Sequence, residues 1–169
     1  EPAHGRLTGA DSGPGRLPEP DQIAEVVRTE LAGFRVEHRW KGKKVVISAG
    51  GTREELDPVR YLGNRSSGRQ GFALAEWACQ MGADVTIVAG NTASLPVPSG
   101  AKVRSIISTR ELEQAMREEA RDADVVIMAA AVSDFRPAEV AESKMKKGQA
   151  DDALSTLHLV ENPDVLKGL

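Results

Sequence analysis

The stretch KKVVISAGG, residues 43–51, decides how the rest of the chain is interpreted. It is a short, continuous run of mainly β-branched residues ending in glycines, which is typical of a parallel strand buried on both faces. A helix is predicted at residues 68–82, GRQGFALAEWACQMG, with Gly82 at its end. A polar, cationic, glycine-rich loop, GNRSSGRQG at residues 63–71, therefore leads from a strand into a helix.

The alternation of strand and helix continues along the chain from this unit. Helix N-caps are predicted at Ser108 or Thr109 and at Asn162, which is followed by Pro163 in the first helical position. We expect a doubly wound α/β domain with a mostly parallel sheet, Rossmann-like topology and right-handed crossovers. Further strands are predicted at residues 83–90, 101–108, 123–132 and 155–161, and further helices at 108–123 and 162–169.

The sequence divides into three parts. Residues 1–20 are rich in Gly and Pro without apolar periodicity, which predicts a loop or tail. Residues 21–42 hold a short amphipathic helix, ending near Gly33, and a charged connector. Residues 43–169 form the predicted α/β domain.

The composition limits the class of partner. The 169 residues carry a net charge of -3, so neither general nucleic-acid binding nor an anionic membrane surface is indicated. No run approaches the roughly 20 apolar residues of a membrane span.

The single cysteine, Cys79, excludes an internal disulfide and is predicted to lie in the core. The histidines His4, His38 and His158 share no zinc-ligand spacing. The first residue is not Met and no signal core follows, so we expect a fragment.

Three loops are predicted to lie at the carboxyl ends of the strands, where open parallel sheets bind their ligands. The first follows Gly50 and Gly51, and its Ser66 and Ser67 either cap the next helix or bind phosphate oxygens. A plain strand–loop–helix turn is the alternative, but about 20 residues exceed the usual two to six, which favours a ligand loop. The loop is neither a Walker A motif nor a compact dinucleotide fingerprint.

The second and third loops are also suited to anions. Small residues from Ala129 to Ala131 leave space beside the sheet, and Asp134 is placed to bind a base amino group or a metal. Lys144, Lys146 and Lys147 follow, and they form either a phosphate-binding segment or a solvated surface. ENPDVL, residues 161–166, offers first-turn N–H groups, with a simple helix cap as an equal alternative. The residues predict a nucleoside triphosphate or another phosphorylated ligand, without deciding between an enzyme and a binding module.

Four segments resemble, in order and spacing, the motifs of the phosphopantothenoylcysteine synthetases. They are SAGGTREELDPVRYLGNRSSGRQG at residues 48–71, AAAVSDFRP at 129–137, SKMKKG at 143–148 and ENPDVL at 161–166. In many bacteria this domain is the C-terminal half of a bifunctional coenzyme A biosynthesis protein, fused to an FMN-dependent decarboxylase. Residues 1–20 resemble the end of that decarboxylase and its substrate clamp.

Two departures from the family pattern affect what is expected of this chain. Thr8 and Gly9 stand where the decarboxylase clamp has Ala and Cys, and His4 stands where Ser is common. The chain is therefore not expected to decarboxylate, and FMN is expected only in the fused decarboxylase domain. Family synthetase domains also continue beyond Leu169 with a strand and a basic segment, so the site is expected to be incomplete.

The resemblance implies a CTP-dependent ligase. The carboxylate of 4'-phosphopantothenate attacks the α-phosphate of CTP, and the acyl-cytidylate formed then reacts with the amine of cysteine. Mg²⁺ or Mn²⁺, a homodimer and a cytoplasmic location are implied as well. The alternatives are an NAD(P)-binding Rossmann-type domain and an inactive nucleotide-binding or dimerisation fragment. An NAD(P) site calls for an acidic residue at the tip of the second strand, and TIVAGN at residues 86–91 has none.

The resemblance also implies roles for individual residues. Asn64 and Lys144 are the implied catalytic residues, and Arg60 is implied to reach substrate or a neighbouring subunit's nucleotide. The metal is expected mainly on the triphosphate, with Asp134 as a possible protein ligand. Implied nucleotide-binding residues are Gly50, Gly51, Ser66, Ser67, Gly68, Met128, Ala129, Ala130, Ser133, Asp134, Phe135, Lys144, Pro163, Asp164, Val165 and Leu166.

Overall fold

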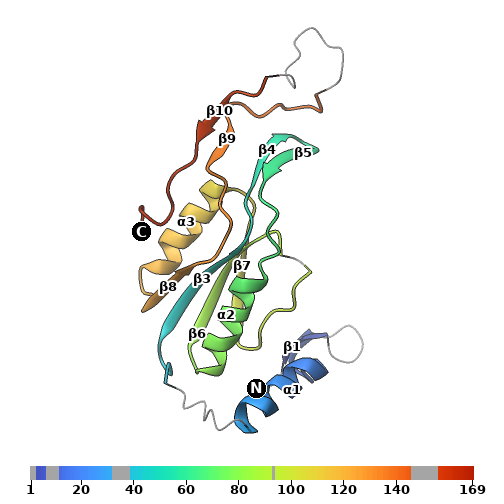
Figure 1. Ribbon diagram of the computed structural model, residues 1–169, viewed down its shortest axis with the longest axis vertical. Coiled ribbons are helices and arrows are strands. Elements are labelled where there is room, and N and C mark those ends of the chain that lie inside the picture. The colour runs from blue at the N-terminus through green and yellow to red at the C-terminus, as the bar shows by residue number, and fades with distance from the viewer. Residues whose placement is uncertain (1–2, 7–11, 32–38, 93, 146–155) are drawn as a thin grey trace.

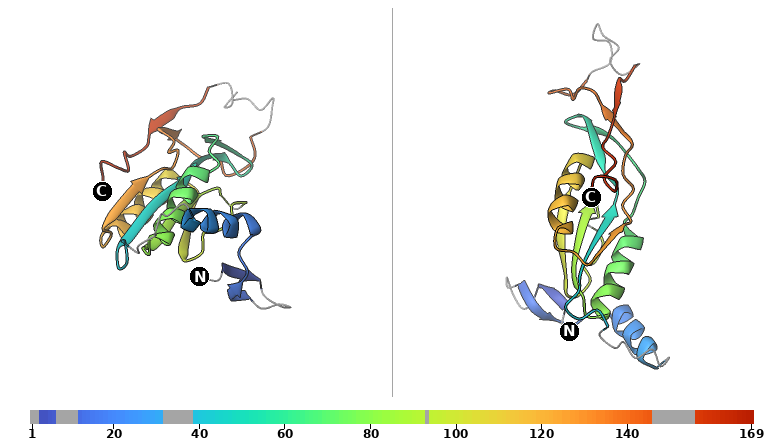
Figure 2. Two further views of the ribbon diagram at one scale, coloured as in Figure 1. Left: turned by 60° about the horizontal axis from the view of Figure 1, so that its bottom comes forward. Right: turned by 90° about the vertical axis from the view of Figure 1, so that its left-hand side faces the viewer.

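A parallel four-stranded sheet forms the centre of the computed structural model, with strand order β7-β6-β3-β8 (Figure 1). The structure describes residues 3–6, 12–31, 39–92, 94–145 and 156–169. Helices α2 and α3 cover opposite faces of the sheet (Figure 2), so the predicted Rossmann-like α/β fold is confirmed. The bounds are β3 Lys44–Gly50, α2 Arg69–Gln80, β6 Asp84–Gly90, β7 Ala101–Ile106, α3 Thr109–Ala120 and β8 Val125–Met128.

Strand β3 is buried on both faces, as its apolar run predicted. Val45 and Ile47 pack with Phe72 of α2 in one apolar cluster. Val46 lies in a second cluster, with Met116 of α3, on the other face. Alternate β3 side chains therefore anchor the two helices, and this arrangement brings the strand ends and the loops after them to one edge of the sheet.

The helix ends agree only in part with the sequence analysis. Ser108 is the N-cap of α3, and its Oγ accepts a hydrogen bond from the Glu111 N–H at 3.3 Å. Gly82, with φ 86, follows the end of α2 as expected. The cap considered as one role of Ser66 and Ser67 is found only in part: the Ser67 Oγ accepts from the Arg69 N–H at 3.5 Å, but the N-cap residue of α2 is Gly68. Only glycine adopts its left-handed backbone, φ 75, without strain.

The C-terminal predictions need correction. Residues 155–161 do not add a strand to the parallel sheet, because β10 (Leu159–Glu161) pairs antiparallel with β9 (Phe135–Pro137). All three β10 residues are exposed, so this strand lacks the apolar faces of a buried one. The predicted helix at 162–169 is replaced by turns, in which the Gly168 N–H donates to the carbonyls of Asp164 and Val165. Strand β8 also ends at Met128, before the predicted residue 132.

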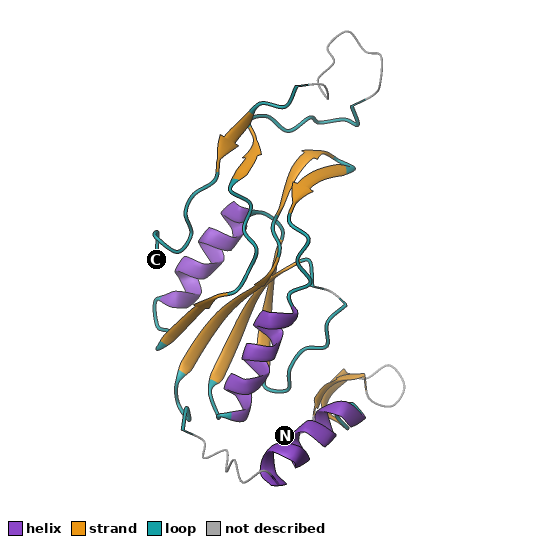
Figure 3. Cartoon of the chain, viewed as in Figure 1, coloured by secondary structure: helices purple, strands orange, loops and turns teal. Residues whose placement is uncertain are grey.

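Two hairpins replace predicted loops (Figure 3). Strands β4 (Arg53–Asp57) and β5 (Arg60–Gly63) pair antiparallel within the segment interpreted as one long loop. Strands β1 (Ala3–Arg6) and β2 (Ser12–Arg16) pair within the segment interpreted as a tail. The amphipathic helix is present as α1, Pro20–Leu31, while Thr8, Gly9 and Gly33 lie outside the described residues. None of the helices in the described ranges is long and apolar enough to cross a membrane.

Candidate functional site

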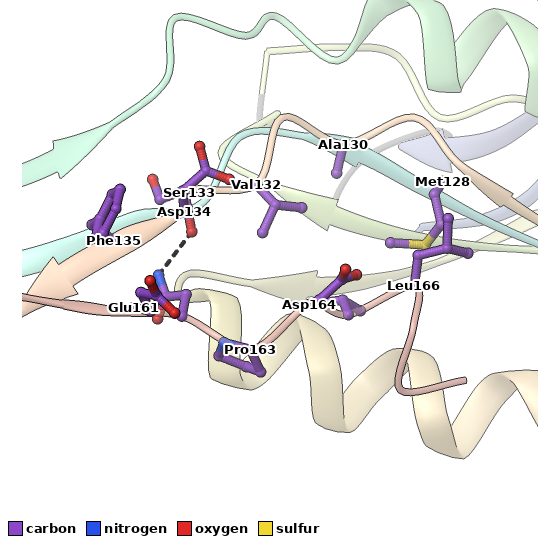
Figure 4. A pocket seen from close by; sticks show the side chains of 12 residues that line it. Met128, Ala130, Val132, Ser133, Asp134, Phe135, Glu161, Pro163, Asp164 and Leu166 are labelled. Atoms are coloured by element: carbon purple, nitrogen blue, oxygen red, sulfur yellow. Dashed lines mark hydrogen bonds between the residues drawn. The ribbon is translucent and has the colours of Figure 1, made fainter.

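A pocket of about 590 Å³ opens beyond the carboxyl end of β8, between two loops far apart in sequence (Figure 4). One wall is the segment that leads from β8 to β9, and the other wall is the segment that follows β10. The pocket is lined by Met128, Ala130, Val132, Ser133, Asp134, Phe135, Glu161, Asn162, Pro163, Asp164, Val165 and Leu166. Nearly all the nucleotide-binding residues implied in these two segments therefore line one cavity. Ala129 is the exception.

Val132, Glu161 and Asn162 also line the pocket, although the sequence did not predict them as lining residues. Asn162 was interpreted as a helix cap, but its Nδ2 donates to the Ser133 carbonyl at 2.8 Å. Its backbone N–H donates to the Asp134 carbonyl, also at 2.8 Å. Asn162 thus joins the two walls of the pocket. Glu161 and Asn162 belong to the quoted ENPDVL motif, so motif membership was the signal that could have found them.

A buried serine shapes the first wall. The Ser48 side chain, on β3, is fully buried, and its Oγ accepts hydrogen bonds from the N–H groups of Ala129 and Ala130, each at 3.1 Å. The Ala129 N–H also donates to the Ser48 carbonyl at 3.2 Å, and the Ala131 N–H donates to the Gly50 carbonyl at 2.7 Å. The small alanines predicted to leave space beside the sheet therefore stay hydrogen-bonded to the end of β3 after β8 has ended.

A buried polar network connects this wall to α3 and to the β4–β5 hairpin. Glu54 is only 4% exposed, and its Oε1 accepts from the Thr109 N–H at 3.0 Å and from the Thr109 hydroxyl at 2.7 Å. The carboxylate therefore lies at the N-terminus of α3, where the helix dipole favours negative charge. Thr52 Oγ1 lies 3.1 Å from Thr109 Oγ1 and accepts from the Ser133 N–H at 2.9 Å. The hairpin thereby supports the pocket wall.

Glycines bring the first loop close to the sheet edge. A Cβ on Gly50, where φ is 81, would lie 1.9 Å from the Gly90 carbonyl oxygen. A Cβ on Gly68 would lie 2.5 Å from Thr92 Cγ2. Backbone contact between the ends of β3 and β6 and the start of α2 thus explains these glycines, whether or not a ligand binds there.

The start of α2 is nevertheless suited to an anion. Its first turn contains no acidic residue and begins with Arg69. N–H groups at a helix N-terminus and the helix dipole attract negative charge. Ser66 is half-buried beside this turn and Ser67 is exposed, with its Oγ 3.5 Å from the Arg69 N–H. Both serines therefore remain candidates for phosphate contact.

Asn64 connects the first loop to the pocket loop. Its Nδ2 donates to the Val132 carbonyl at 3.1 Å, and its own carbonyl accepts from the Ser66 N–H at 2.9 Å. The Thr52 N–H also donates to the Ala131 carbonyl. The structure therefore brings Asn64 beside the segment that forms the first pocket wall, although Asn64 itself does not line the pocket.

Arg60 and the lysine segment meet at the β4–β5 turn. Arg60 donates from Nε and Nη2 to the buried Asp57 carboxylate, at 2.9 and 2.5 Å. Burial alone raises the pKa of Asp57. Hydrogen bonds from the Arg60 side chain and from the N–H groups of Val59 and Met145, with the charge of Arg60, outweigh burial and lower that pKa to about 2. Lys144, next to Met145, is exposed, while Lys146 and Lys147 lie outside the described residues.

The described side chains include no group of three or more His, Cys, Asp or Glu residues that could hold a metal ion. The candidate ligand Asp134 is exposed at the pocket wall. Cys79 is partly buried and packs against the core cluster of β3 and α2, as predicted.

Fold and site together define a Rossmann-like α/β domain with a polar pocket at the carboxyl edge of its sheet. The chain belongs to the family described as the C-terminal domain of DNA/pantothenate metabolism flavoproteins, which residues 40–169 match. The resemblance recognised from the four motifs is thus confirmed at the level of the family.

The relatives agree with this assignment. The coenzyme A biosynthesis bifunctional protein CoaBC of Mycolicibacterium smegmatis is 53% identical over 169 residues, which are 99% of this chain and 40% of that protein. The chain thus spans about two fifths of the length of the curated relatives that it matches.

Solved structures show the same fold. The crystal structure of the C-terminal domain of CoaBC is similar with a TM-score of 0.65 and 36% identity, over 77% of this chain and 59% of that one. A Cab2 mutant in complex with phosphopantothenate-cysteine has a TM-score of 0.60, over 89% of this chain and 67% of that one. At 17% identity its likeness concerns the fold alone.

Proposed function

We propose that this chain belongs to a ligase of coenzyme A biosynthesis that joins 4'-phosphopantothenate to cysteine with CTP. One observation carries the proposal. Two motif segments about 30 residues apart in the sequence, which the family resemblance assigned to the nucleotide, form the two walls of one pocket at the carboxyl edge of the sheet. Membership of the pantothenate-metabolism family supports the substrate class.

The reaction has two steps. A carboxylate oxygen of 4'-phosphopantothenate attacks the α-phosphorus of CTP, and the P–O bond to pyrophosphate breaks. The cysteine amine then attacks the acyl carbon, loses a proton, and CMP leaves as the amide forms. Neither step needs a covalent bond to the protein, so the protein contributes mainly positioning and charge neutralisation.

The described residues suit those tasks. The pocket loops from Met128 to Phe135 and from Pro163 to Leu166 hold the nucleoside. The N-terminus of α2, with Ser66, Ser67 and Gly68, and the Lys144 side chain neutralise phosphate charge. A hard divalent cation such as Mg²⁺ prefers oxygen ligands, so it is held mainly by the triphosphate. Asp134 is the candidate protein ligand for the metal only in the alternative in which its carboxylate does not contact the base.

Asn64 has a role in the second step. Its neutral amide carries both donors and an acceptor, so it bonds an acyl-phosphate without competing for the metal. Its contact with the Val132 carbonyl supports this role, because that bond places the amide beside the pocket wall. If Asn64 guides the intermediate toward cysteine, Asn64→Asp releases pyrophosphate but accumulates acyl-cytidylate. Mass spectrometry of quenched reactions distinguishes this result from equal slowing of both steps, which contradicts the assignment.

The family resemblance is also the basis of the proposed assembly. The protein acts as a cytoplasmic homodimer with a fused decarboxylase domain, in which FMN is bound, and Arg60 reaches the nucleotide of the neighbouring subunit.

Calorimetry of the purified protein with CTP, ATP and NAD, with and without Mg²⁺, tests the function. CTP is expected to bind most tightly, because the pocket backbone and Asp134 read the cytosine edge. Lys144→Gln is expected to weaken CTP binding by about 10- to 150-fold, because a charge-assisted hydrogen bond is lost. Equal affinities for CTP and ATP, or tighter binding of NAD, contradict the proposal.

A further inference from the structure

Asp57 makes more contacts than its place in a hairpin turn requires. Its side chain is fully buried, and Oδ1 accepts from the N–H groups of Val59 and Arg60, each at 2.9 Å. These two bonds close the turn between β4 and β5. Oδ2 is not needed for the turn, and it accepts from the Arg60 guanidinium and from the Met145 N–H at 3.2 Å.

Met145 is held at both of its backbone groups. Asp57 accepts its N–H, and Arg60 Nη2 donates to its carbonyl at 2.6 Å. A third bond lies four residues earlier, where the Ala141 N–H donates to the Leu56 carbonyl at 3.0 Å. The segment at residues 141–145 is thus fixed to the hairpin near both of its ends, and Lys144 lies between the two points.

The contact with Met145 requires both the carboxylate of Asp57 and the guanidinium of Arg60. A buried carboxylate is stable only when its charge is paired and its oxygens are hydrogen-bonded, and Arg60 with three backbone N–H groups meets that need. The planar guanidinium reaches the Asp57 carboxylate and the Met145 carbonyl at once, which a lysine ammonium does not reproduce.

We propose that Asp57 is a positioning residue for Lys144: together with Arg60 it holds Met145, and this fixes the backbone from which Lys144 reaches the triphosphate. The inference rests on the proposed function only for the role of Lys144. It also gives Arg60 a function within its own chain, in addition to any contact with a neighbouring subunit.

Amide hydrogen exchange of Met145 tests the contact itself. Asp57→Asn and Arg60→Lys are each expected to accelerate exchange at the Met145 N–H by about tenfold or more, because charge-assisted bonds are lost. Glu55→Gln is the matched control, since it removes an exposed carboxylate from the same strand, and it is expected to leave this exchange unchanged. Arg60→Lys keeps the test valid if Asp57→Asn unfolds the protein.

CTP titrations test how Asp57 acts. Asp57→Asn is expected to weaken CTP binding by about tenfold in the wild-type background and to have no further effect in a Lys144→Gln background, because coupled residues are not additive. Unchanged exchange at Met145, or the same weakening in both backgrounds, overturns the inference. If exchange accelerates while Lys144→Gln leaves CTP binding intact, the hold on Met145 is supported and the proposed function alone fails.

Discussion

The parallel sheet and the region of hairpin β4–β5 and ribbon β9–β10 above it are stabilised by different forces. In the sheet, Val45, Ile47, Val85 and Ile87 are at most 1% exposed and lie among apolar neighbours. In the upper region most large apolar side chains are exposed, with Leu56 as a buried exception, and several of the buried side chains are polar. Exposed there are Val59, Tyr61, Phe135, Leu159 and Val160, while Glu54, Asp57 and Ser133 are buried.

This difference shows which region of the molecule depends on the identity of its individual side chains. Apolar contacts are non-directional, so many side chains of suitable volume satisfy the sheet. Each buried polar group of the upper region needs one particular partner, and an unpaired one is costly. The pocket is built at the junction, so its shape depends on the less tolerant region. Two substitutions and one change of pH test this contrast.

The largest effect is expected at the junction itself. Gly50→Ala places a Cβ 1.9 Å from the Gly90 carbonyl at φ 81, so strain and clash together cost roughly 3 kcal/mol or more of unfolding free energy. Gly42→Ala is the matched control, because its φ is 78 but nothing lies within 4 Å. It is expected to cost about 1 kcal/mol, from backbone strain alone. Urea unfolding measures both variants, and equal losses rule out the close contact as the cause.

A smaller loss is expected in the polar network. Glu54→Ala leaves the Thr109 N–H and hydroxyl without the carboxylate, which costs about 1–3 kcal/mol of unfolding free energy. Its neighbour Glu55 is exposed, so Glu55→Ala is expected to change stability by no more than about 0.5 kcal/mol. Denaturant unfolding of the two variants makes the comparison. If Glu54→Ala is as mild as Glu55→Ala, the network does not support this region.

The mildest test uses acid. The pKa of Asp57 is lowered from 3.8 to about 2, so its contribution to stability is complete above pH 4 and is lost as the pH falls toward 2. Asp57→Asn lacks this dependence. The wild-type protein is therefore expected to lose more stability than the variant between pH 4 and pH 2, as followed by circular dichroism during denaturant unfolding. Parallel losses in the two proteins contradict an ionised, paired Asp57.

Much of the sheet was predictable because its strands carry their signal locally. Strands β3 and β6 are mainly apolar, and glycine or a capping serine marks the ends of helices near Gly82 and Ser108. The ordered motifs also identified most of the pocket residues. Periodicity and capping depend on neighbours in the chain, so a single sequence reveals them.

The upper region was not predictable in the same way. REELD, residues 53–57, is charged and does not resemble a strand, yet it forms β4. Its Glu54 and Asp57 are buried because Thr109 and Met145 supply hydrogen bonds from distant parts of the chain, and Arg60 supplies them across the hairpin turn. The helix predicted after Asn162 does not form: the Oδ1 that would accept from its first turn accepts from Arg136 Nη1 at 3.2 Å, and Nδ2 donates to the Ser133 carbonyl.

Residue type and spacing along the chain were sufficient to predict the strands and helices of the central sheet, the two apolar faces of β3 and the family motifs. The folded chain was needed to show that the loop after β8 and the segment after β10 form one pocket, and that Arg60 and Asp57 together hold Met145. A buried polar group is stable only where hydrogen-bond partners converge on it, and those partners come from separate elements of the fold, so spacing along the chain does not reveal them.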